Sequence, residues 1–204
     1  MTLSTSCRFR ILLLSGVFAF SLGVPALAAS AGLQRGELGE RYPKAPKVLP
    51  APGASSGLLL VDIVLRFPLG GTGLTGAAVV ATDSAAFIIR AKALSKHVVL
   101  FHDVPVGVHA LRFVTAQGGT TLFAFEVPHT PDCTVFVSPG GVSYLGTTTV
   151  RKKIGFGPPE VQIAYDAERE RESWAIFLKK YPNTPWADLV RARLDSLGGT
   201  QAAR

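Results

Sequence analysis

The sequence predicts a mainly β chain with a helical C-terminus: an antiparallel β-sandwich of about eight strands, immunoglobulin-like or prealbumin-like, followed by an αα-hairpin. Three observations predict this class. Residues 134–150 (TVFVSPGGVSYLGTTTV) alternate with a period of two around a Pro-Gly-Gly turn. Similar segments, separated by Gly- and Pro-containing turns, precede this one from residue 57 onward. Residues 166–181 contain no Gly or Pro and carry apolar side chains at helical spacing.

The first 28 residues have the composition of a secretory signal peptide. Two arginines and no acid precede the apolar run 11–22, and Ala26-Leu27-Ala28 provides a cleavage site of small residues. We expect cleavage after Ala28 and export across the inner membrane, with the periplasm as the destination. The alternative is an uncleaved membrane anchor. Cys7 precedes the apolar run, so it is not placed to carry the lipid of a lipoprotein.

The net charge argues against nucleic acid as a partner. The whole chain has a formal charge of +7, which falls to +5 without the two arginines of the signal peptide. Residues 57–150 contain five basic and five acidic side chains, so the excess lies in the flanks, notably Arg151, Lys152 and Lys153. A dispersed excess of this size is small for a nucleic-acid binder. These three side chains are candidates for contact with an anionic surface, and we expect membrane contact to be peripheral at most.

Residues 29–56 form the first segment of the exported chain. Four prolines, the first at Pro43 and the last at Pro52, stand among Gly, Ala, Ser and Lys with little apolar periodicity. This composition predicts an extended linker, and the alternative is an arm that orders on a partner.

The strands of the β-domain, residues 57–154, follow from alternation. In the first strand, Leu59 and every second residue to Phe67 are apolar, while the other face mixes Leu58 and Leu60 with Asp62 and Arg66. We expect a surface loop at residues 68–76, which lack the lysine of a phosphate-binding loop. Further strands are expected at residues 77–81, 85–91, 96–104, 108–116 and 120–127, each connected as a hairpin.

The last hairpin is predicted within residues 134–150. Pro139 fixes φ at the first corner of the turn, and Gly140 can take the positive φ of the second. Gly146, inside the second strand, predicts a bulge or a close backbone approach.

The helical hairpin is expected over residues 155–199, after a Gly- and Pro-rich hinge, and residues 200–204 are expected to be a disordered tail. The charged run 168–172 is expected to be solvated. Pro182 ends the first helix, and Pro185, at the first helical position, begins the second. The two helices carry an apolar stripe made of Trp174, Phe177, Leu178, Tyr181, Trp186, Val190 and Leu194.

Two resemblances accompany these patterns. DVPVGVHALRF, TLFAFEVP and VFVSPGGVSYLGTTTV, within residues 101–150, resemble small exported β-domains of bacterial lipoproteins of unknown function. That resemblance implies a sandwich and an envelope location, and it brings no catalytic residues. WAIFLKKYPNTPWADLVRARLDSL is similar to a tetratricopeptide-like repeat of envelope assembly proteins, matched at Phe177, Tyr181, Pro182, Ala187 and Leu194. Because the phrase occurs once, its stripe must pack on the β-domain, pair with a second copy or dock on a partner.

No catalytic or metal-binding constellation is apparent. The four histidines, at positions 97, 102, 109 and 129, match no compact ligand spacing. His102 and Asp103 are adjacent on a strand and are expected to point to opposite sides. Cys133 lacks a neighbouring base and is expected to be structural; the alternatives are a reactive thiol and an intermolecular disulfide.

The sequence therefore predicts an exported, non-catalytic envelope protein that acts as a binding or assembly module and needs no cofactor. Its partner is expected to be another envelope protein or a second copy, and the apolar stripe is the candidate partner surface. The alternatives are a small periplasmic enzyme or enzyme inhibitor with a loop-built site, and a module that binds glycan or lipid surfaces.

Overall fold

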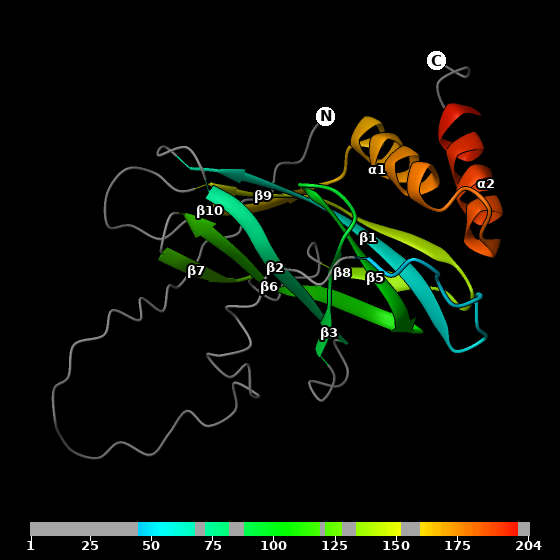
Figure 1. The fold of residues 1–204 in the computed structure, drawn as a ribbon, viewed down its shortest axis with the longest axis horizontal. Helices are drawn as coiled ribbons and strands as arrows, with labels where there is room; N and C mark the ends of the chain where they lie inside the picture. The colour runs from blue at the N-terminus through cyan, green and yellow to red at the C-terminus, as the bar shows by residue number, and fades with distance from the viewer. Residues whose placement is uncertain are drawn as a thin grey trace, which may run out of the picture.

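The structure, a computed structural model, describes residues 45–67, 72–81, 88–118, 121–127, 134–151 and 160–199. Within these ranges the chain forms two five-stranded sheets and two C-terminal helices (Figure 1). The predicted class, mainly β with a helical pair at the C-terminus, is confirmed, and neither sheet closes on itself. No described helix combines the length and the apolar character needed to cross a membrane.

The first sheet is built around β1 (Ser56–Arg66). Its order is β10-β9-β1-β5-β4, with β10 (Glu160–Ala164), β9 (Val142–Arg151), β5 (Val98–Pro105) and β4 (Lys92–Ala93). β1 lies in the centre of the sheet because both of its faces are apolar. One face carries Leu58 and Leu60, the other carries Leu59 and Val61, and all four are fully buried.

The second sheet is built around β6 (Gly107–Gly118). Its order is β3-β2-β6-β7, with β3 (Ile88–Arg90), β2 (Thr72–Ala81) and β7 (Thr121–Glu126), and β8 (Thr134–Val137) also pairs with β6. The described residues thus contain ten strands rather than about eight, two of which, β3 and β4, have three and two residues.

A single apolar core joins the two sheets. Leu59 and Val61 of β1 and Phe101 of β5 pack in one cluster with Leu111 and Val114 of β6. The face of β1 that begins at Leu59 therefore lies against the second sheet, as the alternation predicts.

The predicted last hairpin is wrong in its pairing. β8 pairs with β6 in the second sheet, whereas β9 pairs with β1 in the first sheet, so the turn between them carries the chain from one sheet to the other. The β1–β9 pair is also parallel, against the expected all-antiparallel arrangement. Period-two alternation assigns side chains to faces but does not specify which strand lies alongside.

Two glycine predictions in this region are confirmed. Gly140 has φ +57 at the corner of the turn. Gly146 has φ +115 at a register shift between β1 and β9, and a Cβ built on it would lie 2.9 Å from the carbonyl oxygen of Ala164. Both positions favour glycine because other residues rarely adopt these backbone angles.

Three expected boundaries differ from the structure. Residues 72–76 belong to β2 instead of a loop, because they pair along β6. Residues 160–164, expected to precede a helix, form β10 against β9, with Val161 buried in the core. Residues 45–50, within the expected linker, pack on the helices as described below.

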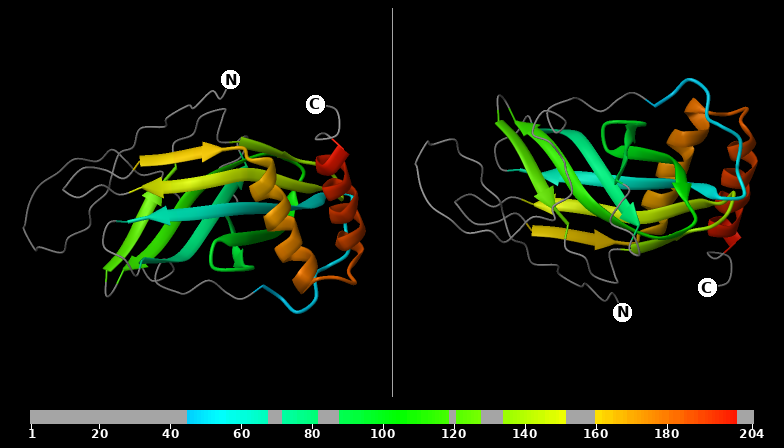
Figure 2. Two further views of the ribbon diagram at one scale, coloured as in Figure 1. Left: turned by 90° about the horizontal axis from the view of Figure 1, so that it is seen from above. Right: turned by 90° about the horizontal axis from the view of Figure 1, so that it is seen from below.

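The helices α1 (Ala167–Lys180) and α2 (Pro185–Gly199) lie over the outer face of the first sheet (Figure 2). The Asp166 side chain accepts hydrogen bonds from the backbone N–H groups of Glu168 and Arg169 and so caps α1. α2 begins at Pro185, as predicted. A second core forms beneath the two helices.

Candidate functional site

The apolar stripe of the helices lies in this second core. Trp174, Phe177, Tyr181, Trp186 and Val190 are buried in one cluster, and Leu178 and Leu194 pack against it with partial exposure. The opposing wall is the outer face of the first sheet, formed by Leu58 and Leu60 of β1 and Val98 and Leu100 of β5. The stripe is therefore covered by the chain's own sheet and does not present a partner surface here. The sequence left three possibilities open for the stripe: packing on the β-domain, pairing with a second copy or docking on a partner. In the structure it packs on the β-domain.

The segment before β1 closes the second core from the side. We call residues 45–50 the strap; its Ala45 and Leu49 are buried in the same cluster. The Tyr181 hydroxyl donates to the carbonyl oxygen of Pro46 at 2.5 Å, and Trp186 Nε1–H donates to the carbonyl oxygen of Pro50 at 2.6 Å. These two donors explain how a tyrosine and a tryptophan are buried without loss of their hydrogen bonds. The strap is thus part of the fold and not a free spacer.

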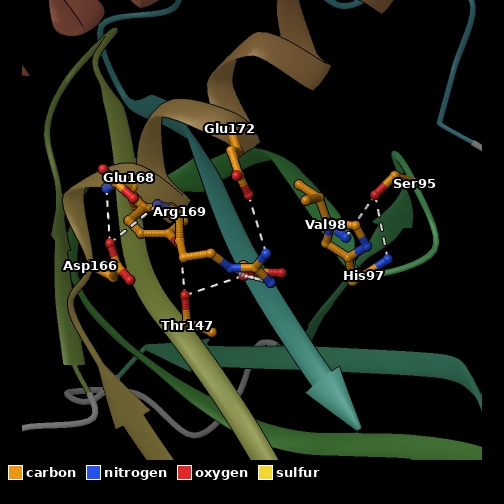
Figure 3. Close-up of polar contacts among 10 residues, drawn as sticks. Ser95, His97, Val98, Thr147, Asp166, Glu168, Arg169 and Glu172 are labelled. Carbon is orange, nitrogen blue, oxygen red and sulfur yellow. Dashed lines mark hydrogen bonds and ion pairs between the residues drawn. The ribbon is translucent and has the colours of Figure 1, made fainter.

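A buried carboxylate fixes α1 on the sheet. Asp62 of β1 is 1% exposed, and its Oδ2 accepts from Arg169 Nε at 2.9 Å, Arg169 Nη2 at 2.8 Å and Thr147 Oγ1 at 3.2 Å. The Arg169 side chain extends from α1 across the strands, with Glu172 on one side and Thr147 of β9 on the other (Figure 3). Asp62 Oδ1 has no hydrogen-bond partner among the described residues. This cluster joins β1, β9 and α1.

The pKa values around Asp62 reflect its burial. Desolvation raises the pKa of Asp62 above its ordinary value, against the opposing effects of Arg169, His97 and Thr147. Desolvation lowers the pKa of Arg169, but the charges of Asp62 and Glu172 outweigh it and raise that pKa overall. Tyr144 is also affected, because burial raises its pKa to about 12. Both pKa values of the pair are raised. The arginine therefore remains charged, whereas burial disfavours the charged form of the Asp62 carboxylate.

A second buried carboxylate fixes α1 to α2. Glu170 is fully buried and accepts from Arg193 Nε at 2.8 Å and Arg193 Nη2 at 3.1 Å, and from Trp174 Nε1 at 3.0 Å. Burial raises the pKa of Glu170, but hydrogen bonds from Arg193, Tyr165 and Trp174 together outweigh it and lower the pKa below its ordinary value. Adjacent residues of α1 thus serve two contacts, Arg169 to the sheet and Glu170 to α2.

The charged run 168–172, expected to be solvated, is solvated only in part: Glu168 and Glu172 are exposed, whereas Glu170 is buried. Arg171 is half-buried, and its Nη2 donates to the carbonyl oxygen of Leu197 at 2.6 Å. The sequence carried one usable signal: Glu170 precedes Trp174 by four residues and so lies on the apolar stripe.

The histidines occupy separate places. His102 Nδ1 lies 2.8 Å from Asp103 Oδ2, against the expectation that the two side chains diverge. The reason is the backbone of Asp103, whose φ of +56 lies at a register shift between β5 and β1 and turns the side chain back. His109 is buried, with Nε2 at 2.7 Å from the carbonyl oxygen of Pro105. His129 and Cys133 lie outside the described residues.

Of the three basic residues expected to contact an anionic surface, the structure describes only the first. Arg151 is exposed at the end of β9, directly opposite Arg66 of β1 in the parallel register, and Lys152 and Lys153 lie outside the described residues. Across the other neighbour, Glu160 of β10 is opposite Arg151.

Within the described ranges, no three His, Cys, Asp or Glu side chains gather as a metal site. No protein-family model, curated protein or solved structure matches the chain.

Proposed function

We propose that this chain is an exported, non-catalytic protein of the cell envelope that acts as a binding or assembly module. The leader-like residues 1–28 support export, and the resemblances to lipoprotein β-domains and to a tetratricopeptide-like repeat support an envelope role. We propose in addition that the two packed sheets belong to the immunoglobulin-like or prealbumin-like type of sandwich.

The observation that carries the binding role is an apolar corner of the second sheet. Val108 of β6 and Phe136 of β8 are cross-strand neighbours, and Val106 precedes them in the turn. Phe136 is 56% exposed, Val108 40% and Val106 39%. Exposed apolar side chains that gather at one place are typical of contact surfaces.

We assign this corner to another envelope protein as the partner. The edge of β8 argues for contact through side chains instead of strand addition, because Ser143 Oγ already donates to the carbonyl oxygen of Phe136 at 3.0 Å. A second copy of the chain is the other occupant that the experiment must distinguish.

The experiment is cross-linking in intact cells, followed by identification of the cross-linked protein. Deletion of the helices is unsuitable, because it would remove one wall of the second core and expose Leu58, Leu60 and Leu100. Phe136→Asp is used instead, with Leu189→Asp on α2, 37% exposed, as the matched control. One defined partner, lost with Phe136→Asp and retained with Leu189→Asp, supports the proposal. A cross-link only between copies assigns the corner to self-association, and identical cross-links in all three proteins reject it.

A second candidate is a small periplasmic enzyme, favoured by the contact between His102 and Asp103. A carboxylate at Nδ1 orients an imidazole and leaves Nε2 as the basic nitrogen, as in general-base catalysis. The purified protein would then hydrolyse or modify envelope glycans, lipids or peptides. Loss of that activity in both His102→Gln and Asp103→Asn would establish an enzyme and overturn the non-catalytic proposal.

A further inference from the structure

The ends of β1 and β9 bring two arginines together on one face of the first sheet. The two strands are parallel, and their last register pair is Arg66 with Arg151. Arg66 lies on the same face as Asp62 and Leu60, four and six residues earlier along the strand. Paired residues of neighbouring strands share a face and lie roughly 5 Å apart. Both side chains are exposed.

The helices do not cover this pair. The arrowheads of β1 and β9 lie side by side at the end of the sheet away from α2 (Figure 2). Along this face the contacts with the helices begin at Leu58 and Leu60, and the ion pair to α1 is made by Asp62. Arg66 lies four residues beyond Asp62 on this face, and solvent reaches both arginines because both are exposed.

Within the part of the chain that the structure describes, no acidic side chain neutralises the charges of the pair. Among the described residues, no carboxylate forms an ion pair with Arg66 or Arg151. Glu160 lies opposite Arg151 on β10, but it has an interaction of its own, and the row of three retains a net positive charge. Like charges directly opposite each other on neighbouring strands destabilise a sheet. An anion held between the two guanidinium groups would remove this repulsion.

We propose that Arg66 and Arg151 form a binding site for a phosphate group. A guanidinium donates two parallel hydrogen bonds to phosphate oxygens, and two guanidinium groups at this spacing can bind one phosphate from both sides. The phosphate can belong to an anionic lipid headgroup or to a soluble phosphate compound. This inference goes beyond the partner role proposed above and does not depend on it, because the two surfaces lie on different sheets.

The experiment measures binding of the purified full-length protein to two probes. The first is vesicles of phosphatidylcholine with or without phosphatidylglycerol, and the second is inorganic pyrophosphate in solution. The test variant is Arg66→Gln with Arg151→Gln. The control, Lys47→Gln with Lys179→Gln, removes the same charge from exposed positions on the strap and α1. All variants share the same segment before the strap, so any contribution of that segment to vesicle binding cancels.

We expect the test variant to bind roughly fivefold more weakly for each arginine removed, with the control close to the wild type. Loss confined to phosphatidylglycerol vesicles assigns the site to lipid headgroups, and loss of pyrophosphate binding alone assigns it to soluble phosphate. Glu160→Gln should strengthen binding, because it removes the one carboxylate in the row. The inference is overturned if neither probe binds, or if the test and control variants lose affinity equally, since that would indicate diffuse attraction to net charge.

Discussion

Arg169 donates from Nε to Asp62 Oδ2 at 2.9 Å, although the two residues are 107 positions apart in the chain. The contact connects the first helix to the central strand, and it places a nearly inaccessible carboxylate under a half-exposed arginine. Neither residue belongs to an apolar pattern. Even so, the position of α1 on the sheet depends on this pair together with the aromatic side chains around it.

Removing the arginine should therefore be costly. Arg169→Met leaves Asp62 buried without its counter-charge, and we expect the free energy of unfolding in urea to fall by about 3 kcal/mol. Asp62→Asn in the same background should restore part of this loss, so that the two changes are clearly non-additive. Arg191→Met is the control, because Arg191 pairs with the exposed Asp188 and should matter by less than about 1 kcal/mol. Equal losses in Arg169→Met and Arg191→Met would contradict a special role for the buried pair.

The strap can be tested through its own lysine. Tyr181→Phe removes only the hydroxyl that donates to Pro46, and we expect about 1 kcal/mol of stabilisation to be lost locally. Trypsin should then cut more rapidly after the exposed Lys47, because the segment opens more often. Leu189→Ala, on the outer face of α2, should leave this cleavage rate unchanged. If Tyr181→Phe leaves the rate unchanged as well, the strap does not depend on this hydrogen bond.

Gly57 of β1 packs against the turn that connects β8 with β9, and it should not tolerate a methyl group. A Cβ on Gly57 would lie 2.6 Å from Val137 Cγ1 and 2.8 Å from the carbonyl oxygen of Ser138. We expect Gly57→Ala to lower the midpoint of urea unfolding, at a cost of about 1–3 kcal/mol. Gly198→Ala is the matched control, since nothing lies within 4 Å of that Cβ, and in a helix alanine should stabilise by up to about 1 kcal/mol. A neutral Gly57→Ala would mean that the contact of β8 with β1 is looser than described.

The two buried carboxylates should respond to acid with opposite signs. The pKa of Glu170 is lowered in the fold, so its contribution to stability is present above its ordinary pKa of 4.5 and is lost as the pH falls through the lowered value. Glu170→Gln should therefore destabilise the protein more at neutral pH than in acid. The raised pKa of Asp62 means that its contribution is fully present below 3.8 and is lost as the pH rises through the raised value. Asp62→Asn should accordingly be tolerated better at neutral pH than in acid, and urea unfolding at several pH values measures both trends. An identical pH dependence in the two variants would show that these groups do not control it.

The sequence by itself determined that the chain is mainly β with two C-terminal helices, and which residues of β1 share a face. The apolar residues at every second position of β1, the positive φ at Gly140, the bulge at Gly146 and the helix start at Pro185 all follow from local rules. These properties are readable because each depends on residues a few positions apart.

Only the tertiary structure decided which elements lie side by side. A strand can pair equally well with several neighbours, so alternation in residues 134–150 could not reveal that β8 and β9 belong to different sheets or that β9 runs parallel to β1. The same limit applies to function. The sequence left three possible contacts for the helical stripe, and the structure buries it against Leu58 and Leu60. The exposed candidates for binding are therefore Phe136 and the pair Arg66 and Arg151. Burial is a sum over contacts between distant segments, and for this reason it is fixed by packing and not by local sequence.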